Sequence, residues 1–147
     1  MTIMKKISII TPVYNESQSI PLLVDEIKTV MSKSGFKYEI IAVNDGSKDD
    51  TEDVLSDIAQ KNKELKVINF NSNKGQSAAL SAGIEKSTGD IIVTIDSDLE
   101  NDPNDILNLI NTMSKGFDVV SGWRDGRWEG NYFSRNFLRS ATAKTTL

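Results

Sequence analysis

The chain has 147 residues, a net charge of −4 and an ordinary share of apolar and charged residues, which describes one compact domain able to bury a core. The negative charge argues against nucleic-acid binding over the whole surface, so any phosphate site must be local. The absence of cysteine and histidine excludes disulfides, thiolate metal sites and histidine-based triads, and leaves carboxylates, hydroxyls, lysine and arginine for chemistry.

Short β-rich runs alternate along the chain with segments of helical period. The runs expected to form strands are residues 6–13, 38–44, 65–70, 90–96 and 117–122. Apolar residues expected to face inward from the helices between them are Ile20, Leu23, Val24, Ile27, Val30, Val54, Leu55, Ile58, Ile106, Leu109, Ile110 and Met113. Asp49 and Glu52 have the spacing of a capping box at the start of the second helix. The alternation predicts a three-layer α/β/α fold with a mainly parallel central sheet.

The fourth expected strand runs into the sequence DSDLE, which places carboxylates at Asp96, Asp98 and Glu100. Residues two apart in extended backbone project to the same side, so these side chains can converge on one point. Ligands of such sheets bind beyond the carboxyl ends of the strands, and no glycine-rich phosphate motif follows any strand here. A diphosphate would therefore need Mg²⁺ or Mn²⁺, which carboxylates suit, and the alternative is a solvated turn before Pro103.

Four ordered motifs carry a family resemblance: ISIITPVYNES, IIAVNDGSKDDT, NKGQSAALSAGI and IIVTIDSDLEND. In order and spacing they resemble the nucleotide-sugar-binding half of the family 2 glycosyltransferases, which have the GT-A fold. The resemblance covers residues 5–125, and DSDLENDP followed by VVSGWRDGR is most similar to the polyprenyl-phosphate sugar transferases, relatives of dolichol-phosphate mannosyltransferase and bactoprenol glucosyltransferase. It implies a nucleotide-sugar-binding GT-A domain at residues 1–125, and a basic, aromatic start of an acceptor-side or membrane-interface region at residues 126–147.

The resemblance also implies roles for single residues. Those implied to contact the nucleotide sugar are Pro12, Tyr14, Glu16, Asp45, Lys74, Gly75, Asp96 and Ser97. Tyr14 would pack near the base, Glu16 would lie near the ribose, and Asp45 would hydrogen-bond the base edge. Taken alone, Tyr14 also fits a partly buried aromatic residue that follows a strand, and Asp45 also fits an Asp-Gly turn. Lys74 and Gly75 also fit a plain loop.

The metal ligands implied by the resemblance are Asp96, Asp98 and Glu100, with Asp98 as the main ligand and a catalytic residue. Glu100 stands where the lipid-phosphate subgroup commonly has glutamine, which adds one negative charge to the site.

Basic and aromatic residues alternate beyond the fifth expected strand. The arginines there are Arg124, Arg127, Arg135 and Arg139. Their planar guanidinium groups match phosphate oxygens, and the resemblance favours Arg124 as a catalytic phosphate contact, with the others as weaker candidates for the acceptor phosphate. The aromatic residues suit a membrane interface, and the alternative is an amphipathic helix that uses them for core contacts.

The implied activity is an inverting transfer of a sugar from a nucleoside diphosphate to a polyprenyl phosphate, with Mg²⁺ or Mn²⁺ on the diphosphate. A UDP-sugar is favoured over GDP-mannose because of its frequency in the family. The implied location is cytoplasmic, with the parent protein at the cytoplasmic face of a membrane. Family members continue well past the position of Leu147, so we expect a truncated chain that binds the donor without completing transfer.

Three alternatives remain open. The first is transfer to a sugar hydroxyl in polysaccharide synthesis, and the second is a donor-binding fragment without activity. The third is a phosphatase of the haloacid dehalogenase type, which would use Asp96 as its nucleophile. In that class the motif normally lies on the first strand and continues with threonine or valine, where this chain has Glu100.

Overall fold

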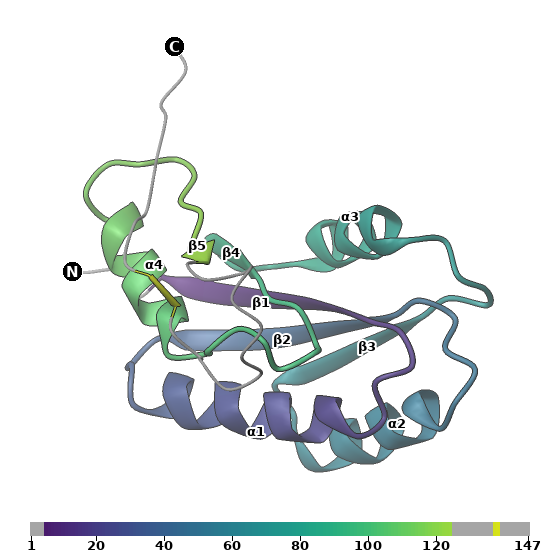
Figure 1. The fold of residues 1–147 in the computed structure, drawn as a ribbon. Helices are drawn as coiled ribbons and strands as arrows, with labels where there is room; N and C mark the ends of the chain where they lie inside the picture. Colours follow the sequence, from purple (N-terminus) through teal and green to yellow (C-terminus); the bar gives the residue numbers. More distant parts are fainter. Residues whose placement is uncertain (1–4, 125–136, 139–147) are drawn as a thin grey trace. The chain divides into compact units, whose positions relative to one another are not determined.

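The computed structural model describes residues 5–124 and 137–138 of the chain (Figure 1). The chain divides into two compact units, whose bounds are Met1–Leu99 and Glu100–Leu147. The predicted domain boundary after residue 125 lies outside the described residues and stays a prediction.

The first unit is built on a four-stranded parallel sheet. Its strands are β1 (Lys6–Val13), β2 (Lys37–Asn44), β3 (Leu65–Asn69) and β4 (Ile91–Thr94), in the spatial order β3-β2-β1-β4. The helices are α1 (Ser19–Ser32), α2 (Thr51–Lys61) and α3 (Gln76–Lys86). In Figure 1, α1 and α2 cover one face of the sheet and α3 covers the other. The predicted three-layer α/β/α fold with a parallel sheet is therefore confirmed.

The central strands β1 and β2 are buried along nearly their whole length, as expected for parallel strands that are covered on both faces. The core on the α3 side consists of Ile10, Ile41, Val43 and Ala79. Small residues in α3 let the helix approach closely, because a Cβ on Gly83 would lie 2.4 Å from Cγ2 of Ile10. On the other face, α1 buries the predicted apolar stripe from Ile20 to Val30.

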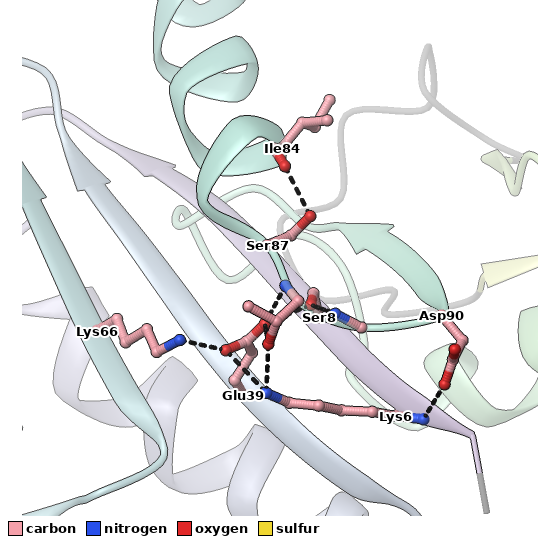
Figure 2. Close-up of polar contacts among 9 residues, drawn as sticks. Lys6, Ser8, Glu39, Lys66, Ile84, Ser87 and Asp90 are labelled. Atoms are coloured by element: carbon pink, nitrogen blue, oxygen red, sulfur yellow. Dashed lines mark hydrogen bonds and ion pairs between the residues drawn. The ribbon is translucent and has the colours of Figure 1, made fainter. Parts of the chain in front are cut away.

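A buried carboxylate lies near the amino end of β2. Glu39 is only 2% exposed, and its Oε2 accepts hydrogen bonds from the ammonium groups of Lys6 (3.1 Å) and Lys66 (2.6 Å). Its Oε1 accepts from the Ser8 hydroxyl (2.6 Å) and from the backbone N–H (2.7 Å) and hydroxyl (2.9 Å) of Thr88. Figure 2 shows the side chains of Lys6, Ser8 and Lys66 converging on Glu39. The contacts connect β1, β2, β3 and the turn before β4 through one side chain.

Two local predictions in the first unit need correction. The helix α2 begins after Asp50, which makes no side-chain cap hydrogen bond, so the predicted capping box from Asp49 to Glu52 is wrong. Asp49 instead accepts a hydrogen bond from the backbone N–H of Thr51 at 3.1 Å. Thr51 is two residues after Asp49, whereas a capping box needs the N–H of the residue three positions on, Glu52. Of the three residues predicted to face inward from α2, Leu55 is buried, whereas Val54 and Ile58 are only half-buried.

The second unit contains α4 (Asp105–Met113), which follows Pro103 as predicted and buries Ile106 and Ile110. The strand predicted at residues 117–122 is wrong. Residues 117–122 pair with no strand among the described residues, whereas β5 (Trp123–Arg124) pairs antiparallel with β6 (Phe137–Leu138). An apolar run forms a strand only where a neighbouring backbone accepts its hydrogen bonds. No helix in the described ranges is long and apolar enough to cross a bilayer.

Candidate functional site

The candidate site lies at the carboxyl ends of β1 and β4. The chain adds β2 and β3 on one side of β1 and then returns to place β4 on the other, which makes this the topological switch point of the sheet. The two strand ends are joined directly, because the Ile95 N–H donates to the Ile10 carbonyl and the Ser97 hydroxyl donates to the Pro12 carbonyl, both at 3.0 Å. Residues that follow β1 and β4 therefore share one crevice.

A cavity of about 390 Å³ opens at this position. It is lined by Pro12, Val13, Tyr14, Glu16, Asp45, Asn73, Gly75, Gln76, Asp96, Ser97 and Asp98. Every residue predicted to contact the nucleotide sugar lines it except Lys74. Sequence reasoning missed Val13, Asn73 and Gln76. The position of Gln76 directly after Gly75, at the start of a helix, was the available signal.

The β1–α1 loop forms one wall of the cavity. Tyr14 is 40% exposed, so a large part of its ring is accessible for stacking. The carboxylate of Glu16 accepts a hydrogen bond from the Ser19 hydroxyl in the first turn of α1. In the facing β2–α2 loop, a hydrogen bond from the Thr51 hydroxyl lowers the pKa of Asp49. Desolvation opposes this shift, and the backbone N–H groups of Thr51 and Ser17 add to it.

Asp45 lines the cavity at the end of β2 and is only 4% exposed. Its Oδ1 accepts the backbone N–H of Lys74 at 2.6 Å, and its Oδ2 accepts the backbone N–H of Gly75 at 2.9 Å. Asp45 thus holds the loop that leads into α3. Each carboxylate oxygen of Asp45 keeps a second lone pair that is available to accept from a base. The predicted contact with a base edge stays a prediction.

Gly46 brings the loops after β2 and β3 into close contact. Its φ is +67°, and a Cβ there would lie 2.3 Å from the carbonyl carbon of Ser72. Gly75, the residue directly before α3, has a φ of 94°, which also favours glycine. The ammonium of Lys74 lies 5.0 Å from the centre of the Phe70 ring, a cation–π contact. Its predicted contact with the donor stays a prediction.

Four carboxylates line the cavity: those of Glu16, Asp45, Asp96 and Asp98. In the described part of the chain, no lysine or arginine is among the lining residues. Asp96 is half-buried and its Oδ1 accepts a hydrogen bond from Nε2 of Gln76 at 3.0 Å, whereas Asp98 is exposed. An anion would enter this cavity against like charge.

The predicted metal ligands are divided by the structure. Asp96 and Asp98 line the same cavity, whereas Glu100 is the first residue of the second unit. Within residues 5–124 and 137–138, no three acidic, histidine or cysteine side chains gather into a metal-binding group. The assignment of Glu100 stays a prediction.

The predicted phosphate contacts lie beyond the first unit. The backbone of Arg124 belongs to β5, in the second unit. Arg127, Arg135 and Arg139 lie outside the described residues.

A parallel sheet with a cavity at its switch point is typical of the α/β proteins that bind ligands beyond the carboxyl ends of their strands. The family model described as glycosyl transferase family 2 matches residues 8–145. The chain therefore belongs to the family 2 glycosyltransferases.

Three solved structures with a similar fold illustrate the likeness. Glucosyl-3-phosphoglycerate synthase from Mycobacterium tuberculosis, in complex with Mn²⁺, UDP and phosphoglyceric acid, is 28% identical with a TM-score of 0.60, over 74% of this chain and 39% of that one. TarS 1-349 of S. aureus is 26% identical with a TM-score of 0.51, over 63% of this chain and 27% of that one.

The third is the mannosyltransferase PcManGT from Pyrobaculum calidifontis, in complex with GDP-Man and Mn²⁺. It is 24% identical with a TM-score of 0.57, over 66% of this chain and 28% of that one, and it supports the fold alone. The chain thus spans well under half the length of these neighbours.

Proposed function

We propose that this chain is the donor-binding domain of an inverting glycosyltransferase that uses a nucleoside-diphosphate sugar and a divalent metal ion. The acceptor we propose is a polyprenyl phosphate, and the favoured donor is a UDP-sugar. In this proposal the protein works in the cytoplasm, at the cytoplasmic face of a membrane, and a longer form of the chain carries out the transfer.

The observation that carries the proposal is the cavity lined by four carboxylates at the switch point of the sheet. Two unit charges 4 Å apart repel by about 4 kcal/mol at the dielectric of a protein surface, so a diphosphate needs a cation to enter. The synthase from Mycobacterium tuberculosis, at 28% identity, binds UDP together with Mn²⁺. Its fold and ligands agree with this account of the cavity.

The residues present fit such an ion. Mg²⁺, and by the same hard-ligand preference Mn²⁺, is commonly held by one or two carboxylates plus phosphate oxygens and water, which needs no cage of three acidic side chains. Asp96 and Asp98, both after β4, supply two of the carboxylates that line the cavity, and Gln76 orients the first. When bound, the ion would act as a Lewis acid that stabilises the departing diphosphate.

The remaining roles fall to the chain itself. Tyr14 would stack on the base, Glu16 would bind the ribose and Asp45 would accept from the base edge. The acceptor oxygen forms a bond to the anomeric carbon while the bond to the diphosphate breaks, and the electron pair leaves with the nucleoside diphosphate. A phosphomonoester has a second pKa of about 6 and is largely ionised at neutral pH, so this acceptor needs no protein base.

The test is calorimetry of the purified chain with UDP, GDP, UDP-glucose, UDP-N-acetylglucosamine and GDP-mannose, each with and without Mn²⁺. We expect Mn²⁺ to raise the affinity for one nucleotide family at least tenfold, which corresponds to about 1.4 kcal/mol. Asp98→Asn should abolish this enhancement. Asp57→Asn makes the same chemical change on an exposed position of α2 and should leave it intact.

The donor-binding proposal is rejected if no nucleotide binds in a metal-dependent way, or if Asp98→Asn retains the full enhancement. Release of phosphate from a phosphomonoester by the chain would instead support the phosphatase alternative. The acceptor is tested on a longer form of the protein, with polyprenyl phosphate compared against a sugar-hydroxyl acceptor.

A further inference from the structure

The loops that follow β1 and β2 are joined by hydrogen bonds at the rim of the cavity. Asn15 in the first loop donates its backbone N–H to Oγ of Ser47 at 2.9 Å. Its side-chain Oδ1 accepts the backbone N–H of Lys48 at 2.8 Å. The backbone N–H of Glu16 then donates to the hydroxyl of Thr51 at 3.0 Å. Asn15 therefore connects the two loops in both directions.

The backbone of Asn15 is left-handed, with a φ of 54°. Among the non-glycine residues that the structure describes, only Leu99 shares a positive φ. Asparagine adopts this conformation more readily than most residues and also offers a side-chain acceptor. Glycine would satisfy the backbone but could not accept from Lys48. Asn15 meets both requirements at once.

Burial does little to fix this loop, because Asn15 is exposed and Tyr14 is 40% exposed. The position of such a loop depends on directional hydrogen bonds more than on packing. Tyr14 and Glu16, the two neighbours of Asn15, both line the cavity, whereas Asn15 does not. Whatever holds Asn15 therefore also sets where these two side chains stand.

The facing loop begins at Asp45, which lines the same cavity. The N–H of Asp45 donates to the Val13 carbonyl at 2.8 Å. We infer that Asn15 is a positioning residue for the nucleoside side of the donor site, because it fixes the separation of Tyr14 and Glu16 from Asp45. This inference rests on the proposed function of the cavity. It predicts that losing the Asn15 side chain weakens nucleotide binding without changing the contribution of the metal.

The experiment compares Asn15→Gly, Asn15→Asp and Ser47→Ala with the unmodified chain. Asn15→Gly keeps the backbone conformation and loses the bond to Lys48, while Asn15→Asp keeps both the conformation and the acceptor. Ser47→Ala removes the second bond without touching Asn15. Affinities for UDP and GDP are measured by calorimetry with and without Mn²⁺, in salt of about 0.3 M to screen the added carboxylate.

Asn15→Gly and Ser47→Ala should each lower the affinity for the preferred nucleotide about fivefold, in line with the loss of one hydrogen bond each. The reduction should be the same with and without Mn²⁺, and Asn15→Asp should bind within about threefold of the unmodified chain. A merely structural role would not produce this pattern, since a folded but less stable variant binds normally.

Unchanged nucleotide affinity in Asn15→Gly, with the unmodified chain binding normally, overturns the inference and leaves the proposed function standing. So does a loss confined to the metal-dependent part of binding. If the unmodified chain binds neither UDP nor GDP in the presence of Mn²⁺, the proposed function itself fails.

Discussion

The carboxylate of Glu39 should be a major source of stability for the sheet, and Glu39→Gln tests this directly. Glutamine keeps the shape and one oxygen but removes the charge. If its amide nitrogen takes the place of Oε2, it faces the ammonium groups of Lys6 and Lys66. If it takes the place of Oε1, Ser8 and Thr88 lose the oxygen to which they donate. In both orientations donors meet donors at a position that is 2% exposed.

The size of the effect follows from how well each partner can return to water. The side chains of Lys6 and Lys66 are 34% and 50% exposed, so their pairs with Glu39 are screened and each contributes about 1 kcal/mol or less. Hydrogen bonds from Ser8 and Thr88 to a charged, buried oxygen contribute about 1.5–3 kcal/mol each, without full additivity. We expect Glu39→Gln to lower the free energy of unfolding by about 2–4 kcal/mol, a large part of a domain's stability.

The assay is urea unfolding, in which the midpoint should fall while the m-value stays constant. Glu85→Gln makes the same chemical change at an exposed position of α3 and should shift the free energy by less than about 0.5 kcal/mol. Equal midpoints for Glu39→Gln and Glu85→Gln would refute the reasoning. They would show that the cost of burying Glu39 cancels its contacts.

The same prediction has a pH signature. Burial alone would raise the pKa of Glu39, but hydrogen bonds from Lys66, Ser8, Thr88 and Lys6 outweigh it and hold the pKa well below its ordinary value of 4.5. The unfolded chain therefore binds the proton first, so this contribution is present above pH 4.5 and is lost as the pH falls below it. The difference between the unmodified chain and Glu39→Gln should shrink on acidification, and a constant difference would contradict the assignment.

Three further changes test other parts of the structure. Gly46→Ala should destabilise the chain by about 2–4 kcal/mol in urea unfolding, because it forces a side chain into a left-handed position against the backbone of Ser72. Thr11→Val should leave stability unchanged or raise it by about 1 kcal/mol, because the buried Thr11 hydroxyl has no hydrogen-bond partner among the described residues. Gln76→Leu should reduce the Mn²⁺ enhancement of nucleotide affinity about threefold by releasing Asp96, measured by calorimetry.

The sheet could be predicted from sequence because its central strands are buried on both faces. A strand such as β1 is then rich in buried β-branched residues, which a single sequence reveals. The run at 117–122 also contains β-branched residues but has no strand partner in the part of the chain that the structure describes, and composition carries no information about partners. The predicted cap of α2 was wrong for a related reason. Asp49 and Asp50 have the same side chain, and only the backbone conformation decides which of them takes the N-cap position.

The outline of the site could be predicted because the carboxyl ends of parallel strands meet at one edge. Polar residues after β1 and β4 must then lie close together, and the cavity contains Tyr14, Asp96 and Asp98 as expected. The contacts between loops could not be predicted. Asp45 reaches residues 29 and 30 positions away, and such contacts depend on side-chain rotamers that sequence spacing does not define.

The structure separates two sets of acidic side chains that look alike in the sequence. Glu39 meets two lysines and three neutral donors from its own chain, so its charge is compensated within the fold. The contacts of Asp45 and Asp96 come from neutral N–H groups, which orient a carboxylate without cancelling its charge. A fold gains nothing for its own stability by grouping such carboxylates around an open cavity. In the proposed function, a ligand that brings positive charge with it compensates the carboxylates of Asp45 and Asp96 in this cavity.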